Sequence, residues 1–283
     1  MSEKKKDKKI VQTLLFEILF FCLVLVLGLF SAIEAKFILI ESNIEVQKIN
    51  FEGFLFYFLI GTVFVLGISY FRKIRKYRGA IYKFLFVFAF AYGALTVLSL
   101  FFIDIITIVL ILILLFLWFK LSSVWVHDIV MILSLAGIGA IFGLAMEPKV
   151  VVLLLLALSV YDFIAVYKTK HMIKMAKSML SYGVVMGIIV PKEVKDFKEK
   201  VTNISPGGRF MVLGGGDIIF PLLFSVSLLD KGIVSVLTVA GFSLVGVAAS
   251  LLIFLLQKEQ KPIPALPPIA LFSIMGYIIT LLI

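Results

Sequence analysis

Nine apolar blocks separated by short polar segments constrain this chain more than any other feature. Most reach the roughly 17–25 residues that a tilted helix needs to cross about 30 Å of hydrocarbon. With 62% hydrophobic and 16% charged residues, the chain has too little polar surface for a soluble domain. We therefore predict an all-α polytopic membrane protein with nine transmembrane helices. The blocks are 11–33, 51–71, 81–103, 104–119, 129–146, 150–167, 210–229, 233–257 and 265–283.

The third and fourth blocks touch, and together they resemble one long apolar segment. Asp104 lies at their junction. A charge is costly at the centre of a bilayer, so its position predicts a tight turn between two separate helices.

Lysine and arginine residues fall mainly on one side of this topology. Of the 27 in the chain, all but Lys36, Lys48, Lys149 and Lys231 lie in alternate connections, beginning with the N-terminal tail. Because positive residues stay on the cytoplasmic side, we expect a cytoplasmic N-terminus and an extracellular C-terminus in the cell membrane. This topology also accounts for the net charge of +10. Nucleic acid is not expected as a partner, because the basic residues form no continuous face.

The connection 168–209 divides the chain into three parts. A six-helix bundle is expected over 1–167 and a three-helix unit over 210–283. Methionine and lysine residues interleave at helical spacing in 168–182, which predicts a basic amphipathic helix on the inner membrane surface. The rest of the connection is predicted to be a polar loop, and its apolar run 184–190 is too short to cross the membrane.

Two aspartates lie inside predicted spans, where charges are costly and usually functional. Asp162 is near the cytoplasmic end of the sixth block, and Asp217 is near the cytoplasmic start of the seventh. At 1.5 Å per residue, each carboxylate should lie about 9–12 Å below the cytoplasmic boundary. Consecutive antiparallel helices tend to be neighbours, so we expect the two carboxylates to face each other.

Two close carboxylates in a low-dielectric site share one proton. One of them takes a proton from a water molecule, which attacks a peptide carbonyl, while the other hydrogen-bonds to the carbonyl oxygen. This chemistry requires no metal, cofactor or covalent intermediate. Asp162 and Asp217 therefore indicate an aspartyl endopeptidase that works inside the membrane.

Glycine and proline residues flank these elements. Gly214, Gly215 and Gly216 lack a Cβ atom, so the backbone before Asp217 can unwind and pair with an extended substrate. Their alternative role is to permit tight helix packing. Four prolines in 262–268 predict an extended segment at the start of the ninth span. That segment is either a wall of the substrate site or an ordinary helix start.

Taken together, these motifs resemble those of the presenilin-type GxGD intramembrane aspartyl proteases. They are YD at 161–162, LGGGD at 213–217 and PAL at 264–266, in the family's order and on the matching spans. The resemblance implies a catalytic pair, Asp162 and Asp217, and substrates that are single-span transmembrane helices. It also implies residues that support the site or bind substrate, namely Tyr161, Leu213, Gly214, Gly215, Gly216, Pro264, Ala265 and Leu266.

The predicted orientation bears on which branch of the family the chain resembles. A cytoplasmic N-terminus favours the presenilin branch, because signal peptide peptidases are expected to insert the other way round. The connection 168–209 lacks the long hydrophilic loop of eukaryotic presenilins, which suggests a microbial, archaeal homologue. It also argues against autoproteolytic maturation and against a need for the accessory subunits of gamma-secretase. A homo-oligomer is left open.

A proton-coupled secondary transporter is the main alternative, because transporters also use buried aspartates and Gly-broken helices. The absence of an evident internal repeat in the sequence weighs against it. An inactive scaffold that binds helices is disfavoured by the intact pair of aspartates. The sequence also lacks the HExxH motif of zinc proteases and the GxSG motif of rhomboid-like proteases.

Other polar and small residues in the spans have simpler interpretations. Glu17 is predicted to face the helix bundle or to reach the inner interface. His127 and Asp128, at the start of the fifth span, are predicted to be solvated anchors. The GxxxG spacing of Gly139 and Gly143 predicts close helix packing.

Overall fold

The structure is a computed structural model that describes residues 3–57, 59–60, 77–169, 171–204, 209–257 and 262–282. Helices dominate it. Those before the polar connection are α1 (Glu3–Glu41), α3 (Arg78–Leu98), α4 (Asp104–Leu121), α5 (Val124–Ala145) and α6 (Pro148–Phe163). Helix α7 (His171–Ser181) lies within the polar connection. The helices that follow it are α8 (Gly215–Ser227), α9 (Ile233–Leu256) and α10 (Leu266–Thr280). Strands β1 (Gly187–Pro191) and β2 (Phe210–Gly214) form an antiparallel pair.

Six helices in the described part of the chain are long and apolar enough to cross a membrane. They correspond to the first, the third to sixth and the eighth predicted spans. Helix α10 is a shorter apolar helix within the ninth block, and the second block extends into 61–71, outside the described residues. The chain is therefore a mostly helical, multi-span membrane protein.

The seventh predicted span is wrong in its first part. Residues 210–214 form β2 instead of a helix, and the helix α8 begins only at Gly215. The partner strand β1 comes from the apolar run 184–190, so the prediction of a polar loop there is wrong. A short apolar run does not distinguish a strand from a buried helix by periodicity alone, so only the pairing of the two runs reveals the hairpin.

The predicted separation of the third and fourth blocks is confirmed. Helix α3 ends at Leu98 and α4 begins at Asp104. Asp104 lies in the first turn of α4, where a negative charge interacts favourably with the helix dipole. The predicted helix in 168–182 is also confirmed by α7.

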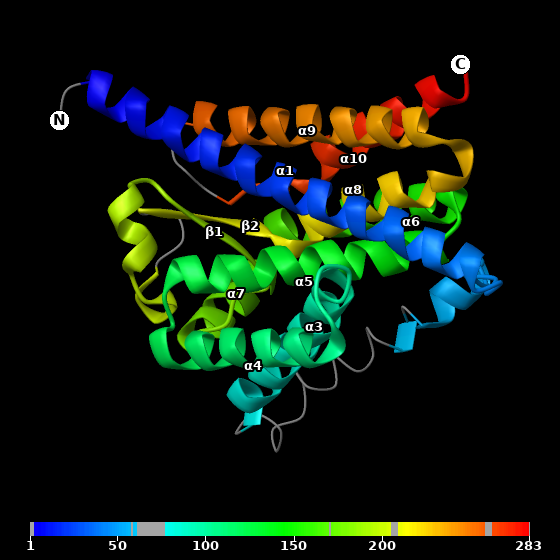
Figure 1. The fold of residues 1–283 in the computed structure, drawn as a ribbon. Coiled ribbons are helices and arrows are strands. Elements are labelled where there is room, and N and C mark those ends of the chain that lie inside the picture. Colours follow the sequence, from blue (N-terminus) through cyan, green and yellow to red (C-terminus); the bar gives the residue numbers. More distant parts are fainter. Residues whose placement is uncertain are drawn as a thin grey trace.

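Helix α5 forms the centre of the fold and packs against α1, α3 and α8 (Figure 1). Glycines allow these close approaches. A Cβ atom on Gly137 would meet the backbone of Gly93 in α3, and Gly139 and Gly143 lie directly against side chains of α8. The predicted packing role of Gly139 and Gly143 is therefore confirmed. Helices α9 and α10 pack together on one side of α8, and α1 crosses the front of the bundle in Figure 1.

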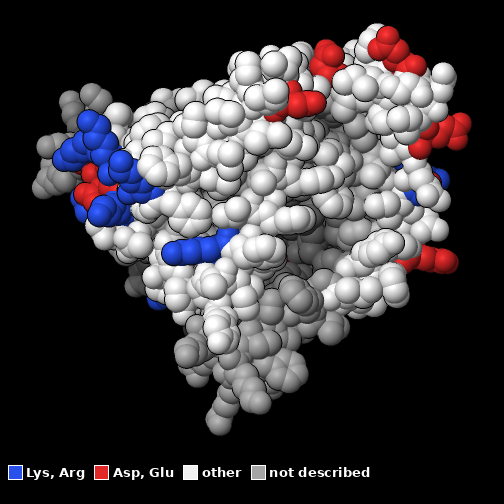
Figure 2. Space-filling view, turned by 60° about the horizontal axis from the view of Figure 1, so that its bottom comes forward, with Lys and Arg blue, Asp and Glu red and all other residues white. Residues whose placement is uncertain are grey.

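On the face seen in Figure 2, charged side chains gather at the ends of the molecule. Figure 2 shows most visible Lys and Arg residues at one end and most Asp and Glu residues at the opposite end, with a broad band almost free of charge between them. Large apolar side chains are exposed on several helices; examples are Val26, Phe84, Ile105 and Leu252. A band of this kind is stable in contact with hydrocarbon, not with water.

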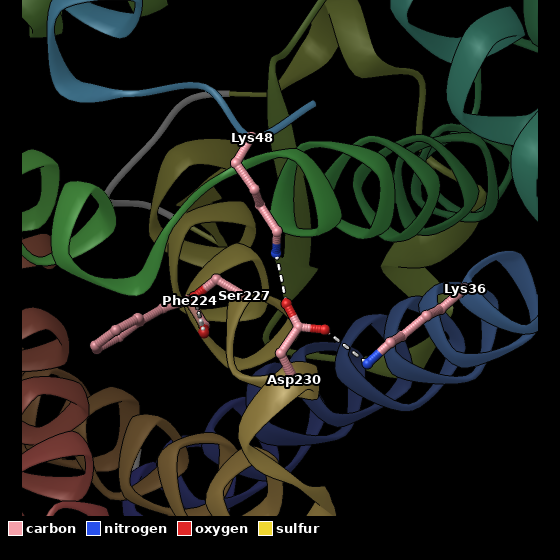
Figure 3. Close-up of polar contacts among 5 residues, drawn as sticks. All are labelled: Lys36, Lys48, Phe224, Ser227 and Asp230. Carbon is pink, nitrogen blue, oxygen red and sulfur yellow. Dashed lines mark hydrogen bonds and ion pairs between the residues drawn. The ribbon is translucent and has the colours of Figure 1, made fainter. Parts of the chain in front are cut away.

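One ion-pair cluster joins three segments at the turn between α8 and α9 (Figure 3). Asp230 forms salt bridges of 2.8 Å with Lys36, at the end of α1, and with Lys48, in the segment after α1. The two lysines hold the pKa of Asp230 below its usual range, chiefly through these hydrogen bonds. Nearby, the Ser227 hydroxyl donates to the carbonyl oxygen of Phe224 within α8.

Candidate active site

Asp162 lies where the sixth span changes its helical geometry. Helix α6 ends at Phe163 and continues as a π-helical turn over Ile164–Lys168. Such π-helical turns occur frequently at functional sites. The Asp162 side chain is buried, with 7% exposed, and its Oδ2 accepts a 3.4 Å hydrogen bond from the backbone N–H of Leu266.

Asp217 lies in the first turn of α8, directly after β2. Gly214 is the residue that caps this helix, and the Asp217 carboxylate lies against it: a Cβ atom on Gly214 would be 2.9 Å from Oδ2 of Asp217. Asp217 is the third residue of the helix, the position from which an acidic side chain in a capping box reaches the N-cap amide. This position places a partly buried carboxylate at the positive end of a short helix.

The structure brings the two aspartates together. Helices α6 and α8 pack against each other, and the charges of Asp162 and Asp217 interact. Helix α10, which begins at Leu266, packs against both α6 and α8. The YD, GxGD and PAL motifs therefore meet in one region, although they are far apart in the sequence.

A third carboxylate belongs to this region. Glu17 of α1 is buried, with 3% exposed, and its charge also interacts with Asp217. Its Oε2 has no hydrogen-bond partner among the described residues. The sequence left open whether Glu17 faces the bundle or the interface, and the structure places it in the bundle. The signal was present in the sequence, since a charge inside a span is costly and usually marks a functional position.

The PAL segment is only partly extended. Residues 262–265 have no regular structure, but α10 begins at Leu266, so Pro267 and Pro268 lie in its first turn. Proline is tolerated there because the first helical N–H groups have no partner within the helix. Pro264 and Leu266 are buried and Ala265 is half-buried. The extended segment was predicted to include all four prolines, but only Pro262 and Pro264 lie before the helix.

The three glycines before Asp217 differ in their surroundings. A Cβ atom on Gly214 would meet Oδ2 of Asp217 at 2.9 Å, and one on Gly215 would meet the Met186 carbonyl oxygen at 3.0 Å. Gly216 is exposed. Gly214 therefore permits a close approach to the Asp217 carboxylate, and Gly215 permits a close approach to the backbone just before β1.

Two further residues of the motifs lie on different faces. Tyr161 is 59% exposed and points away from the interior, whereas Leu213 of β2 is buried. The structure therefore does not bring the Tyr161 side chain into the group formed by Asp162, Asp217 and Leu266.

In the described part of the chain, no three His, Cys, Asp or Glu side chains are placed to hold a metal ion.

The prediction that His127 and Asp128 are solvated anchors is wrong. Their side chains are 0% and 2% exposed, because β1 packs against the start of α5. Asp128 Oδ1 accepts a 2.8 Å hydrogen bond from the Ile189 N–H, and His127 Nε2 lies 3.2 Å from the Gly187 carbonyl oxygen. Since the sequence did not reveal the hairpin, it did not reveal this contact.

These features define a multi-span helical protein with a pair of interacting aspartates, one where α6 changes to a π-helical turn and one in the first turn of α8. The family of signal-peptide peptidases and presenilin aspartyl proteases matches residues 9–283. The chain belongs to this family, and it is therefore an intramembrane aspartyl protease.

Solved structures support the same fold. Two crystal forms of a presenilin family intramembrane aspartate protease, in the C222 and P2 space groups, share 24% sequence identity with this chain. Each comparison covers 94% of this chain and 96% of the other, with TM-scores of 0.60 and 0.61 respectively. No curated protein sequence matches the chain.

Proposed function

We propose that Asp162 and Asp217 are the catalytic pair with which this protease hydrolyses peptide bonds inside single-span membrane helices. The observation that carries the proposal is the convergence of three motifs. The charges of the two aspartates interact, and the PAL residue Leu266 donates a hydrogen bond to Asp162. A general acid–base pair requires this kind of proximity before anything else.

The chemistry follows from one proton shared by two carboxylates. The ionised group takes a proton from water, and the resulting hydroxide attacks the peptide carbonyl. The protonated group donates a hydrogen bond to the carbonyl oxygen as negative charge develops there. Collapse of the tetrahedral intermediate breaks the C–N bond, transfers a proton to the leaving amine and returns the pair to its state with one shared proton. The protein needs no cofactor or metal for these steps.

The substrate must be extended where it is cut, and β2 offers an edge for it. Phe210 and Val212 direct their backbone groups away from β1, and no partner for these groups is found among the described residues. An added strand on that edge would run directly into the turn at Gly214 and Asp217. Leu213, Gly215, Gly216, Pro264 and Ala265 would then support the site, and the exposed Tyr161 would contact the substrate or lipid outside it.

We further propose nine spans, with a cytoplasmic N-terminus and an extracellular C-terminus, in the cell membrane. The charge asymmetry of the connections supports this orientation. The chain would consist of a bundle over 1–167, an interfacial connection over 168–209 and a C-terminal unit over 210–283. It would act on helical substrates within the lipid bilayer without accessory subunits or nucleic acid, alone or as a homo-oligomer.

The test is cleavage of a fluorogenic single-span peptide by the purified protein in detergent. Asp162→Asn and Asp217→Asn should each reduce the rate by at least about 10²–10⁴-fold, the contribution expected of a general acid or base. Both variants should remain monodisperse and helical. A hydroxyl isostere of the tetrahedral intermediate should inhibit the wild type.

Substantial turnover by either variant would overturn the assignment of the pair. The transporter alternative, which the family does not favour, predicts a different result. In that case the wild type would cleave none of several peptides, and vesicles containing it would show proton-coupled uptake that depends on the aspartates.

A further inference from the structure

The β1–β2 hairpin has two edges, and they differ. The Lys192 N–H donates to the Arg209 carbonyl oxygen and the Gly215 N–H donates to the Met186 carbonyl oxygen. Even-numbered residues of β1 therefore bond to β2. Because successive residues of a strand direct their backbone groups to opposite edges, Gly187 and Ile189 face outward. The outer edge of β1 thus presents the carbonyl of Gly187 and the amide of Ile189.

Side chains of α5 occupy this outer edge. Asp128 Oδ1 accepts from the Ile189 N–H at 2.8 Å, and His127 Nε2 lies 3.2 Å from the Gly187 carbonyl oxygen. The Asp128 acceptor and the His127 donor therefore contact the two backbone groups on either side of Ile188. A neighbouring strand would offer the same pair of contacts. His127 and Asp128 take the place of a third strand.

The donor role of His127 is fixed by its other ring nitrogen. Trp118 Nε1 lies 3.3 Å from His127 Nδ1, and an indole N–H can only donate. Nδ1 therefore accepts, and the proton of the neutral ring is on Nε2, facing Gly187. Phe86 stacks on His127 and on Trp118, with ring centroids 5.4 and 4.5 Å apart. The imidazole is held in place on both its edge and its face.

We propose that His127 and Asp128 are positioning residues for the catalytic centre, which fix the hairpin against α5 and leave the outer edge of β2 open for a substrate strand. This inference rests on the proposed catalytic role of Asp217. The chain of contacts is short. Asp128 holds Ile189 of β1, β1 pairs with β2, and β2 ends at Gly214, which lies directly against the carboxylate of Asp217.

Matched substitutions at Asp128 separate its hydrogen bond from its volume. Asp128→Asn keeps an oxygen that accepts from the Ile189 N–H, whereas Asp128→Leu has a similar size and no acceptor. His127→Phe keeps an aromatic ring beside Phe86 but makes neither hydrogen bond. Ile132→Ala is the control for general loss of packing, since Ile132 is a buried apolar residue one turn further along α5.

Three measurements on the purified full-length protein test the proposal. Peptide cleavage gives kcat and KM, mass spectrometry of the products gives the bonds that are cut, and amide hydrogen exchange gives the protection of 187–190. For Asp128→Leu and His127→Phe we expect kcat to fall by roughly 10–100-fold, because a displacement of about 1 Å in an active site costs this much. KM should change little, new cleavage positions should appear, and 187–190 should exchange faster. Asp128→Asn should restore the wild-type cleavage positions and protection.

Two outcomes would overturn the proposal. In one, folded Asp128→Leu keeps the wild-type kcat, cleavage positions and exchange rates. In the other, it loses activity only as much as Ile132→Ala does, with unchanged cleavage positions, which indicates a general effect on packing. The exchange measurement does not depend on proteolysis. If the wild type cleaved no peptide, the proposed function would fail, and protection of 187–190 would still decide whether His127 and Asp128 hold β1.

Discussion

Leu266 and Asp162 are 104 residues apart in the sequence, yet the backbone N–H of Leu266 lies 3.4 Å from Oδ2 of Asp162. This contact gives the PAL motif a physical role. The segment before α10 turns so that the first amide of the helix, which has no partner within the helix, is directed at a carboxylate. The side chain of Leu266 is buried, with 4% exposed, and anchors that amide in place.

Leu266→Ala should therefore lower protease activity more than it lowers the amount of folded protein. Loss of a buried leucine side chain costs about 2–5 kcal/mol of stability and lets the amide move away from Asp162. The control is Leu271→Ala in the same helix, because Leu271 is 59% exposed. Peptide cleavage and thermal unfolding should be measured for both. Equal activity of the two variants at equal folded fraction would contradict the role of Leu266.

Gly214→Ala should leave the fold intact and impair catalysis. The added Cβ would lie 2.9 Å from Oδ2 of Asp217, a side-chain atom that can rotate away. The backbone of Gly214 has φ −60° and ψ 139°, which alanine adopts without strain. We expect kcat to fall by about 10²-fold through displacement of the carboxylate. Gly241→Ala is the control, since its Cβ would meet nothing within 4 Å and Gly241 lies outside the site. Wild-type activity of Gly214→Ala would count against the placement of Asp217.

Activity should depend on pH with a bell-shaped profile. Below the optimum both aspartates carry a proton and no base is available, and above it both are ionised and no acid is available. The profile of kcat/KM reports the two apparent titrations of the pair, not of either residue alone. It should be measured with a peptide that has no titrating groups near the cut. A flat profile across the acidic range would contradict a shared proton.

Gly137→Ala should destabilise the protein by about 1–3 kcal/mol, the usual effect of adding atoms to a packed interior. Its new Cβ would meet the backbone carbonyl of Gly93, which cannot rotate away. In Gly241→Ala the new Cβ meets nothing within 4 Å, so this variant should be as stable as the wild type or slightly more stable. Thermal unfolding of both variants in the same detergent tests the prediction. Similar melting temperatures for the two would show that α3 and α5 are not closely packed.

Asp230 should contribute stability that is lost in acid. Because Lys36 and Lys48 lower its pKa in the folded state, its contribution is complete above the unfolded value of about 3.9 and disappears as the pH falls through the folded value. The side chain is 58% exposed, so the contribution should be about 1 kcal/mol or less. The melting temperatures of wild type and Asp230→Asn should differ at pH 7 and converge at about pH 3. A difference that persists at pH 3, or that is unchanged in high salt, would contradict an ionic origin.

The sequence predicted the parts of the fold that depend on composition and local spacing. Long apolar blocks predicted six spans that the structure describes, and Asp104 correctly predicted the break between α3 and α4. Matched depth predicted that Asp162 and Asp217 meet, because a position along a helix converts directly into a distance across a membrane. These inferences needed no knowledge of tertiary contacts.

The hairpin and its contacts were not predictable in the same way. Two five-residue strands that lie about 20 residues apart carry no helical or alternating signal of their own. Once β1 is placed beside α5, the burial of His127 and Asp128 follows from the contacts with Gly187 and Ile189. In the sequence, only the polar character of His127 and Asp128 beside an apolar span stands out. That character does not distinguish residues exposed to solvent at the membrane boundary from buried residues that hold a strand in place.

The open edge of β2 has a consequence for water. A transmembrane helix satisfies all its backbone groups internally, so it can lie in hydrocarbon, but an unpaired strand edge cannot. The outward amides and carbonyls of Phe210 and Val212 therefore require hydration whenever no substrate strand covers them. If β2 receives the substrate strand, the strand that displaces this water is the same one that brings the peptide bond to Asp217, so substrate binding and the local removal of water are one event.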